Sequence, residues 1–315
     1  MVKDYNVGDV IRGDHRVITV RKGELSRVYI CRQELPGGNF AYKALKTFRF
    51  SSDEIGRKLF ERELVYWARL PPHTNIVQAK DADTVERLLV LEHVRGPTLR
   101  QVASKRPVHP RHFLKWAREL ADGLSFLHKE SFLHRDLRPT NVMIDAENDL
   151  RVKITDLGIG KPFDPQAASH NIIGTFTYMA PEVHLGKTDF RSDIFSFGAT
   201  LYYLLTGNFA VKLTTANLES VVSPRSLVPT VPEEVAAFVL KCVQREPEAR
   251  YQSMDEVQNE LSALAEWDAD AALYNECAEH NFTYYAGGTN PVCPFCLYEA
   301  SFREQLQKLE QKLSD

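Results

Sequence analysis

The sequence lacks the features that mark membrane, nucleic-acid-binding and disulfide-rich proteins. No stretch approaches the ~18 uninterrupted apolar residues of a membrane-spanning helix, and the first 20 residues hold no apolar run of signal-peptide length. The 39 basic and 42 acidic residues give a formal net charge of −3, so we expect neither nucleic acid nor a membrane as partner. Five cysteines are too few for a disulfide scaffold. We therefore expect a cytoplasmic protein.

The hydrophobic pattern of the chain changes near residue 98, from patterns typical of strands to patterns typical of helices. At 315 residues, the chain is long enough for one large two-lobed domain with an appendage or for two ordinary domains, and a hydrophobic content of 43% can fill a core. β-branched runs predict strands at 15–20, 27–32, 40–45 and 87–94, and apolar spacing predicts one helix at 53–70. Apolar helical faces predict helices at 110–130, 193–207, 233–244 and 254–267, with an irregular loop at 213–232. The fold class is therefore α+β.

Three motifs in the second half of this pattern point to one chemistry. Residues 134–141 read HRDLRPTN, residues 156–158 read DLG, and residues 180–182 read APE. In order and spacing they resemble the catalytic loop, the Asp-Phe-Gly segment and the A-P-E segment of protein kinases. The resemblance covers roughly residues 10–265.

The resemblance is to eukaryote-like (Hanks-type) protein kinases of the serine/threonine branch. It implies a bilobal protein-kinase fold with a β-rich N-lobe that carries one helix and a mainly α-helical C-lobe. A small zinc-binding module and helix would follow. The domains implied are an N-lobe at 1–93, a C-lobe at 94–266 and a zinc-binding tail with a C-terminal helix at 267–315.

The family's catalytic roles carry over to matching positions, since phosphoryl transfer depends on positioned charges. By this resemblance, Asp136 accepts the proton of the substrate hydroxyl. Asn141 and Asp156 bind Mg²⁺ (or Mn²⁺), which accompanies ATP. Asp193 matches a buried aspartate that braces the catalytic loop, and Arg250 matches an arginine that pairs with the A-P-E glutamate.

The phosphate-binding lysine is inferred from a strand motif. Ala41-Tyr42-Lys43 resembles the V-A-I-K strand of the family, so Ala41 would line the nucleotide site and Lys43 would hold the α- and β-phosphates. Glu63, on the predicted helix, would hold Lys43 in place, with Glu61 as a competing candidate. An ordinary solvated lysine–glutamate pair is the alternative interpretation.

The glycine loop of the family is only partly present. Aligned on Val28, the stretch 20–28 keeps Gly23, at the central glycine position, and has Ser26 and Arg21 at the other two. Gly23 permits close approach of the main chain to phosphates. We expect Gly23, Ser26 and Val28 to contact the nucleotide.

The adenine is expected against the segment that follows the strand at 87–94. Leu91 would be the gatekeeper, and the main-chain groups of Glu92 and Val94 would contact the adenine edge. For Leu91, plain core packing is the alternative.

The activation segment indicates the substrate class. Residues 174–182 resemble the GTxxYxAPE segment of serine/threonine kinases, in which Thr175 would hydrogen-bond into the catalytic loop. Arg138 stands where these kinases usually carry a lysine that meets the transferring phosphate, and we expect it to substitute for that lysine. Ser169 and Thr177 are candidate autophosphorylation sites.

The tail offers four metal ligands in two pairs. Cys277 and His280 are followed by Cys293 and Cys296, a spacing typical of a structural Zn²⁺ site. Free thiols or a redox-active pair are the alternatives. The apolar helical spacing at 301–313 predicts a helix too short to be stable alone, which must pack on the zinc module, on the kinase or on a partner.

The sequence therefore predicts an ATP-dependent serine/threonine protein kinase that acts on protein substrates. Its zinc tail would serve docking or regulation, and a cognate phosphatase is one possible partner through it. The alternative is a pseudokinase scaffold that binds nucleotide without phosphoryl transfer. The retained Asp136, Asn141 and Asp156 favour the enzyme.

Overall fold

The structure is a computed structural model whose contacts divide the chain into two compact units. The first unit comprises Met1–His73, Val77–Val94 and Leu297–Asp315, and the second comprises Thr74–Ile76 and Arg95–Cys296. The tail predicted at 267–315 is thus divided between the two units. The residues described are 4–23, 26–48, 61, 64–104, 107–157, 177–210, 213–214, 217–218, 221–269, 271–286 and 292–314.

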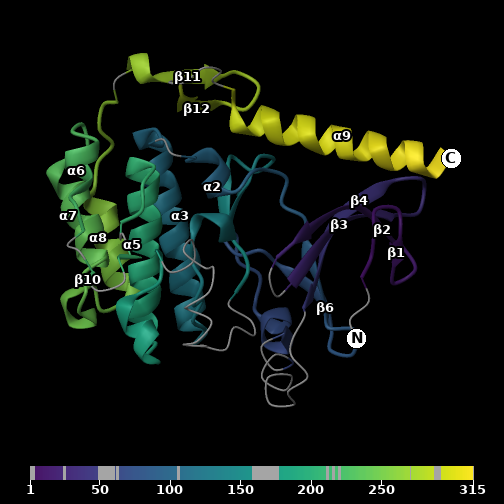
Figure 1. The fold of residues 1–315 in the computed structure, drawn as a ribbon, viewed down its shortest axis with the longest axis horizontal. Helices are drawn as coiled ribbons and strands as arrows, with labels where there is room; N and C mark the ends of the chain where they lie inside the picture. Colours follow the sequence, from purple (N-terminus) through teal and green to yellow (C-terminus); the bar gives the residue numbers. More distant parts are fainter. Residues whose placement is uncertain are drawn as a thin grey trace. The chain divides into compact units, whose positions relative to one another are not determined.

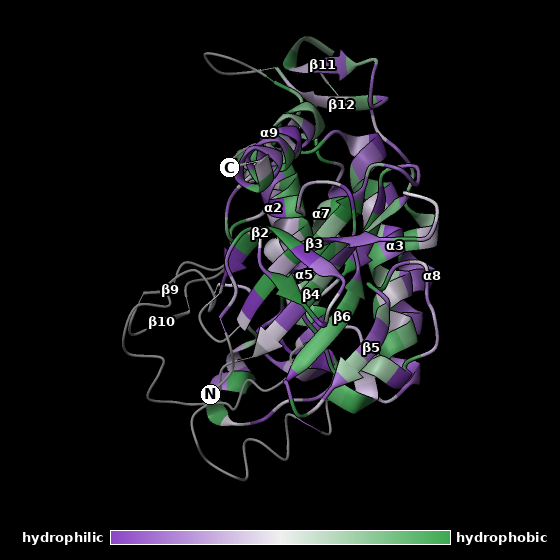
Figure 2. Cartoon of the chain, turned by 90° about the vertical axis from the view of Figure 1, so that its right-hand side faces the viewer, coloured by the Kyte–Doolittle hydropathy of each residue, from purple (hydrophilic) through white to green (hydrophobic). Residues whose placement is uncertain are grey.

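The first unit contains a six-stranded antiparallel sheet, which confirms the predicted strand-rich part of the chain. Its strand order is β1-β2-β3-β4-β6-β5, and β6 is hydrophobic along most of its length (Figure 2). Residue 61 and residues 64–69 are helical, within the helix predicted at 53–70. The strands are β1 (Val10–Ile11), β2 (His15–Lys22), β3 (Ser26–Glu34), β4 (Phe40–Phe48), β5 (Ala79–Asp83) and β6 (Leu88–Glu92).

Both faces of this sheet are apolar. Successive side chains of a strand point to opposite faces, and the neighbours Tyr29 and Ile30 of β3 accordingly belong to different hydrophobic clusters. The cluster around Tyr29 is built from strand residues: Ile11, Val17, Tyr29, Cys31, Leu45, Leu88 and Val90. The cluster around Ile30 also contains Phe302 and Leu309, which come from the C-terminal end of the chain.

The C-terminal helix α9 (Pro294–Ser314) is longer than the one predicted at 301–313. It starts within the Cys-Pro-Phe-Cys segment, and proline suits a first helical position. From Leu297 onward, α9 belongs to the first unit and lies along its sheet (Figure 1). The helix that could not be stable alone therefore packs on this sheet.

The second unit is mainly helical, as predicted. Helices α3 (Pro110–Lys129), α5 (Phe190–Thr206), α7 (Glu233–Cys242) and α8 (Met254–Ala263) pack on one another (Figure 1). Helix α5 is buried on all sides from Ser192 to Thr206. The other elements are α2 (Leu99–Val102), α6 (Pro224–Leu227), the strand pairs β7 (Val142–Asp145) with β8 (Arg151–Ile154), β9 (Leu213–Thr214) with β10 (Asn217–Leu218), and β11 (Tyr274–Cys277) with β12 (Phe282–Tyr285), and the 3-10 turns η1 (Pro139–Asn141), η3 (Pro181–Leu185), η4 (Pro247–Ala249) and η5 (Ala271–Leu273).

A buried ion pair ties the A-P-E segment to the helices of this unit. Arg250 donates two hydrogen bonds to Glu182, at 2.7 and 2.8 Å, as the sequence predicted. It also donates to the carbonyl of Arg191, at 3.0 Å. Burial alone would raise the pKa of Glu182, but the hydrogen bonds from Arg250 hold it below its ordinary value. The carboxylate is thus ionised where it accepts these bonds.

The part of the chain that the structure describes contains no helix with the length and apolar character needed to cross a membrane.

A glycine in α5 gives a test of this packing. A Cβ on Gly198 would lie 2.3 Å from the Cβ of Cys242 and 2.9 Å from Val243, whereas one on Gly123 in α3 would meet nothing closer than 3.0 Å. Alanine stabilises a helix interior by about 1 kcal/mol relative to glycine, and overpacking costs about 1–3 kcal/mol. Chemical denaturation should therefore show Gly198→Ala lowering the free energy of unfolding clearly and Gly123→Ala changing it by less than about 1 kcal/mol. Two stabilised variants would contradict this packing.

Candidate functional site

The catalytic loop is held by the buried carboxylate of Asp193. This side chain accepts hydrogen bonds from the amides of His134 at 2.8 Å and Arg135 at 2.9 Å, and it lies 3.0 Å from Nε2 of His128. Burial would raise the pKa of Asp193, but its hydrogen bonds, that to His128 foremost, keep it lowered. These contacts confirm the predicted bracing role, and they support a left-handed backbone at Arg135, with φ of +63°.

His134 connects the two motifs of the site. Its Nδ1 accepts a hydrogen bond from the amide of Asp136 at 3.2 Å, so its Nε2 carries the proton and donates to the carbonyl of Thr155 at 3.0 Å. Burial lowers the pKa of His134. The neutral ring therefore joins the backbone before Asp156 to the backbone of Asp136.

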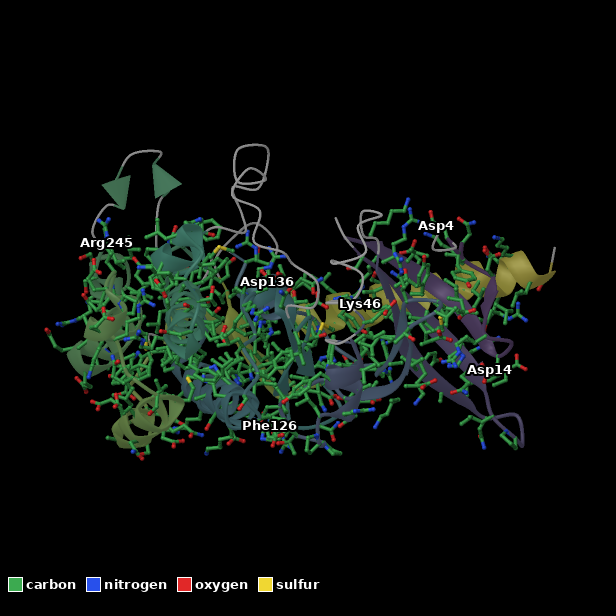
Figure 3. The ribbon with its side chains drawn as sticks, turned by 90° about the horizontal axis from the view of Figure 1, so that it is seen from below. Asp4, Asp14, Lys46, Phe126, Asp136 and Arg245 are labelled. Atoms are coloured by element: carbon green, nitrogen blue, oxygen red, sulfur yellow. The ribbon has the colours of Figure 1, made fainter. Side chains whose placement is uncertain are left out.

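Asp136 and Asn141 lie in direct contact, at the position labelled in Figure 3. The amide nitrogen of Asn141 donates to the carboxylate and to the main-chain carbonyl of Asp136, both at 2.8 Å. Arg138 Nε lies 3.7 Å from the same carboxylate. Asp136 is 8% exposed and Asn141 is 3% exposed. The structure thus brings together these three predicted residues.

Asp156 follows directly on this group. The amide of Thr155 donates to the carbonyl of Asn141 at 2.9 Å, and Asp156 itself adopts a left-handed backbone, with φ of +58°. The amide nitrogen of Asn141 is committed to Asp136, and its Oδ1, which accepts a hydrogen bond from the Thr140 hydroxyl at 3.2 Å, has a second lone pair that a cation could use. Asn141 and Asp156 carry the oxygen ligands that a hard cation such as Mg²⁺ prefers.

The predicted glycine loop forms the turn between β2 and β3 in the first unit. The amide of Gly23 donates to the carbonyl of Ser26 at 2.9 Å, and a Cβ on Gly23 would lie 3.3 Å from Ser26 atoms. Arg21 is opposite Val28 in the strand register and is exposed. The retained glycine is therefore hydrogen-bonded to the first residue of β3.

The strand register separates two groups of residues that the sequence placed in one site. Val28 is opposite Lys46 in the β3–β4 pair. Leu91 is opposite Ala44, two residues before Lys46, in the β4–β6 pair. Since paired residues share a face and alternate residues return to it, Val28, Lys46 and Leu91 lie on one face. Lys43 lies on the other.

Ala41 and Lys43 therefore do not join Val28 and Leu91 as expected. Lys43 is directly opposite Glu92, which makes it one half of a cross-strand pair. Sequence reasoning missed Lys46, which is 6% exposed and is labelled in Figure 3. The triplet Ala44-Leu45-Lys46 fits the same A-x-K pattern as Ala41-Tyr42-Lys43, and this signal could have identified Lys46.

The segment expected to contact adenine ends β6. Leu91 is 3% exposed and Val94 is 5% exposed. The amide of Glu92 donates to the carbonyl of Gln78 at 2.9 Å, so this amide is not a candidate for adenine contact.

Some predicted positions lie outside the described residues: Glu63, Gly158, Ser169 and Thr175. Glu61, the competing candidate, is described and is helical. Thr177, a candidate modification site, is only 6% exposed.

The four predicted zinc ligands converge in the second unit. All their ligand atoms lie within 4.8 Å of one another. The sulfurs of Cys277 and Cys296 are 3.7 Å apart, and His280 Nδ1 lies 3.4 Å from Cys277, 3.5 Å from Cys296 and 3.9 Å from Cys293. Tetrahedral zinc with ordinary bond lengths separates two sulfurs by about 3.8 Å and a sulfur from a nitrogen by about 3.6 Å. The cluster therefore fits a four-coordinate zinc ion.

The thiols of this cluster differ in acidity. Burial opposes ionisation of Cys277, but hydrogen bonding with His280 lowers the pKa of Cys277 to about 7. Burial and the neighbouring Cys277 raise the pKa of Cys296 to about 12. Without a metal, one cysteine would ionise readily and its neighbours would resist, which is the behaviour of thiols that share one small volume.

The segment that carries the four candidate zinc ligands is packed into the second unit by a series of aromatic contacts. Phe295 stacks on His280 with ring centroids 5.6 Å apart and contacts Phe282 edge-on at 5.0 Å. Phe282 in turn lies 4.7 Å from the ring of His112 and 6.0 Å from that of Trp116, both in α3. Phe282 is 2% exposed and Phe295 is fully buried.

His112 also receives a hydrogen bond from this segment. The amide of Thr283 donates to Nε2 of His112 at 3.1 Å, which requires that this nitrogen be unprotonated. Burial, followed by the charge of Arg111, lowers the pKa of His112 to about 3. The strand β12 is therefore held to α3 by a neutral histidine.

Comparison with known proteins gives one family. Residues 15–261 match the protein kinase domain family. The chain is 30% identical over 270 residues to a probable serine/threonine-protein kinase of Clostridium acetobutylicum, which covers 81% of this chain and 40% of that protein. It is 27% identical over 278 residues to the serine/threonine-protein kinase PrkC of Bacillus subtilis, which covers 84% of this chain and 42% of PrkC.

A third relative, the serine/threonine-protein kinase PknB of Mycolicibacterium smegmatis, is 31% identical over 269 residues, which cover 79% of this chain and 42% of that protein. The chain thus spans about two fifths of the length of these curated relatives. The family match ends at residue 261, so the four candidate zinc ligands lie beyond it.

The neutral His112 predicts a pH dependence of stability. Its pKa is about 3 in the folded protein and about 6.5 in an unfolded chain. Between these values the unfolded state binds more protons, so the stabilisation is complete above about pH 6.5 and is lost as the pH falls. The loss approaches 1.4 kcal/mol per pH unit, or about 2 kcal/mol by pH 5.

His112→Gln keeps an acceptor for the amide of Thr283 but does not titrate. Urea unfolding of both proteins at pH 5 to 7.5 should show the advantage of the wild type shrinking towards low pH. The candidate zinc ligands also take up protons, but they do so in both proteins, so the difference isolates His112. Parallel curves would mean that His112 does not titrate in this range.

Proposed function

We propose that this chain, which belongs to the protein kinase domain family, transfers the γ-phosphoryl group of ATP to serine or threonine hydroxyls of proteins. The observation that carries the proposal is the contact between Asp136 and Asn141 on a loop braced by Asp193. The names of the relatives support the serine/threonine class. Protein substrates follow from the proposal, and the cytoplasmic location stays a prediction from the sequence.

In this proposal, Asp136 accepts the proton of the attacking hydroxyl. Asn141 holds the Asp136 carboxylate in one orientation through its hydrogen bond of 2.8 Å, and this orients the proton acceptor towards the substrate hydroxyl in the proposal. Arg138, 3.7 Å from the same carboxylate, supplies a cation for the transferring phosphate. The contact of Thr175 with the catalytic loop, predicted from the sequence, is also part of the proposal.

Mg²⁺ or Mn²⁺ would be held by Oδ1 of Asn141 and the carboxylate of Asp156. When bound, the cation offsets the negative charge of the triphosphate. In this proposal, the nucleotide half-site in the first unit is formed by Gly23, Ser26, Val28 and Leu91, with the main-chain carbonyl of Glu92 and the main-chain groups of Val94. We propose Lys46, in place of Lys43, as the lysine that holds the phosphates, because Lys46 shares a face with Val28 and Leu91.

We also propose that Cys277, His280, Cys293 and Cys296 hold a structural Zn²⁺ ion. Four protein ligands leave no open position for catalysis, so the ion contributes to folding. The aromatic side chains around the site are buried within the chain itself, and this favours an internal structural role over the predicted docking of a partner such as a phosphatase.

Two lysines of one strand give the sharpest test of the active site. With purified protein, Mg²⁺ and radiolabelled ATP, Lys46→Met should reduce phosphate incorporation into protein by a factor on the order of 100 or more, because the phosphates lose their cation. Lys43→Met, three residues away, should retain most of the activity. Label should be found on serine or threonine.

Asp136→Asn gives the baseline for this assay, because it removes the proton acceptor. Label that persists in Asp136→Asn would show a contaminating kinase. A wild type that binds ATP but incorporates no label would support the pseudokinase scaffold. Loss of activity in Lys43→Met with retention in Lys46→Met would return the role to Lys43.

Metal content tests the zinc site. The purified wild type should contain one zinc ion per chain, and Cys293→Ala should lose most of it and unfold at a lower temperature, since structural zinc contributes folding free energy. Cys242→Ala is the matched control, because Cys242 is a buried free thiol outside the cluster. A zinc-free wild type would refute the site, and so would equal zinc content in the two variants.

A further inference from the structure

The helix α9 lies on the face of the sheet that we assign to the nucleotide. Its side chains Phe302, Leu306 and Leu309 belong to one apolar cluster with Val28 and Ala44. Ala44 is opposite Leu91, and Val28 is opposite Lys46, so the helix and these proposed nucleotide contacts share one face. Val28 and Ala44 stay half-buried, which means that the helix borders them without covering them completely.

At its N-terminal end, α9 contacts the residue between the two proposed adenine-contacting positions. His93 lies between Glu92 and Val94. The ring of Phe302 stacks on the ring of His93, with centroids 5.6 Å apart and an angle of 23°. The hydroxyl of Tyr298 lies 3.5 Å from Nε2 of His93.

Phe302 also contacts the neighbouring strand. Its ring meets that of Tyr42 on β4 edge-on, with centroids 5.5 Å apart, and that of Tyr298 in parallel, at 6.2 Å. Phe302 is 7% exposed. One helical side chain is therefore held between β4 and the end of β6, the two strands that carry Lys46 and Leu91.

The first turn of the same helix contains a metal ligand. Cys296 is two residues before Tyr298 and six before Phe302, which is about 9 Å along the helix. A zinc–sulfur bond at Cys296 would fix this turn. The other end of the helix is held separately, by a hydrogen bond of 2.6 Å from Lys312 to the carbonyl of Val7.

We propose that Phe302 is a positioning residue for nucleotide binding, and that zinc at Cys296 fixes the helix that carries it. Phe302 and Tyr298 hold the side chain of His93, and so the backbone of Glu92 and Val94, in place for the adenine. The inference rests on the proposed function in one respect, namely that a nucleotide binds this face of the sheet.

A matched pair of variants on α9 tests the positioning role. Phe302→Leu keeps most of the apolar volume but loses the stacking on His93. Leu309→Ala removes a fully buried side chain of the same cluster, seven residues away and near the end held by Lys312. Both variants should lower the unfolding temperature, so stability alone does not distinguish them.

Nucleotide binding does distinguish them. With a fluorescent ATP analogue and Mg²⁺, Phe302→Leu should weaken binding about tenfold, the equivalent of one aromatic contact, and Leu309→Ala should stay within about twofold of the wild type. In the kinase assay, Phe302→Leu should raise KM for ATP with little change in kcat. Unchanged binding in Phe302→Leu would overturn the inference, and tighter binding would do so too, because it would mean that the helix obstructs the nucleotide.

The proposed link between the metal site and Phe302 is tested by combining substitutions at the two positions. Cys296→Ser should weaken binding of the analogue in the wild type and should add little in the Phe302→Leu background, because both changes act through the same helix. If the losses of binding caused by Cys296→Ser and Phe302→Leu simply added up in the double variant, the proposed link between the metal site and Phe302 would be wrong. Since binding is measured directly, a protein that binds ATP without transferring phosphate would refute the proposed activity and leave this inference standing.

Discussion

The catalytic loop depends on a single buried carboxylate. Asp193, 1% exposed, accepts hydrogen bonds from two successive amides, those of His134 and Arg135. Without these bonds, the left-handed backbone of Arg135 would cost on the order of 1–3 kcal/mol with nothing to offset it. His134 is in turn hydrogen-bonded to the carbonyl of Thr155, and Asn141 donates a hydrogen bond to the carboxylate of Asp136. The loop that carries Asp136 is thus held by a residue nearly 60 positions further along the chain.

Much of this arrangement follows from the sequence. The motifs at 134–141, 156–158 and 180–182 predicted the family, the bracing by Asp193 and the pair of Arg250 with Glu182. The sequence could not decide between Lys43 and Lys46, because two A-x-K triplets lie three residues apart on one strand. A shift of three residues moves a side chain to the other face of a sheet. Only the strand register, which depends on pairing with β3 and β6, separates Lys43 from Lys46.

In the tail, too, the local pattern could be predicted from the sequence but the contacts with distant parts of the chain could not. The spacing of cysteine and histidine predicted four ligands, and the structure brings all four together. The surroundings of the site were not predictable, because Phe282 and Thr283 meet His112 some 170 residues away in the sequence. Apolar spacing predicted a helix at 301–313 but gave no sign that it begins at Pro294, within the segment that carries Cys293 and Cys296.

Because α9 covers part of the sheet, a fragment must include α9 if its first unit is to stay free of an exposed apolar patch. A fragment that stopped at residue 261, where the family match ends, would lack Phe302 and Leu309. Ile18, Ile30 and Tyr42 would then face water together, and a contiguous apolar patch of this kind promotes self-association. For this chain, the boundary of the family is therefore not the boundary of the folding unit.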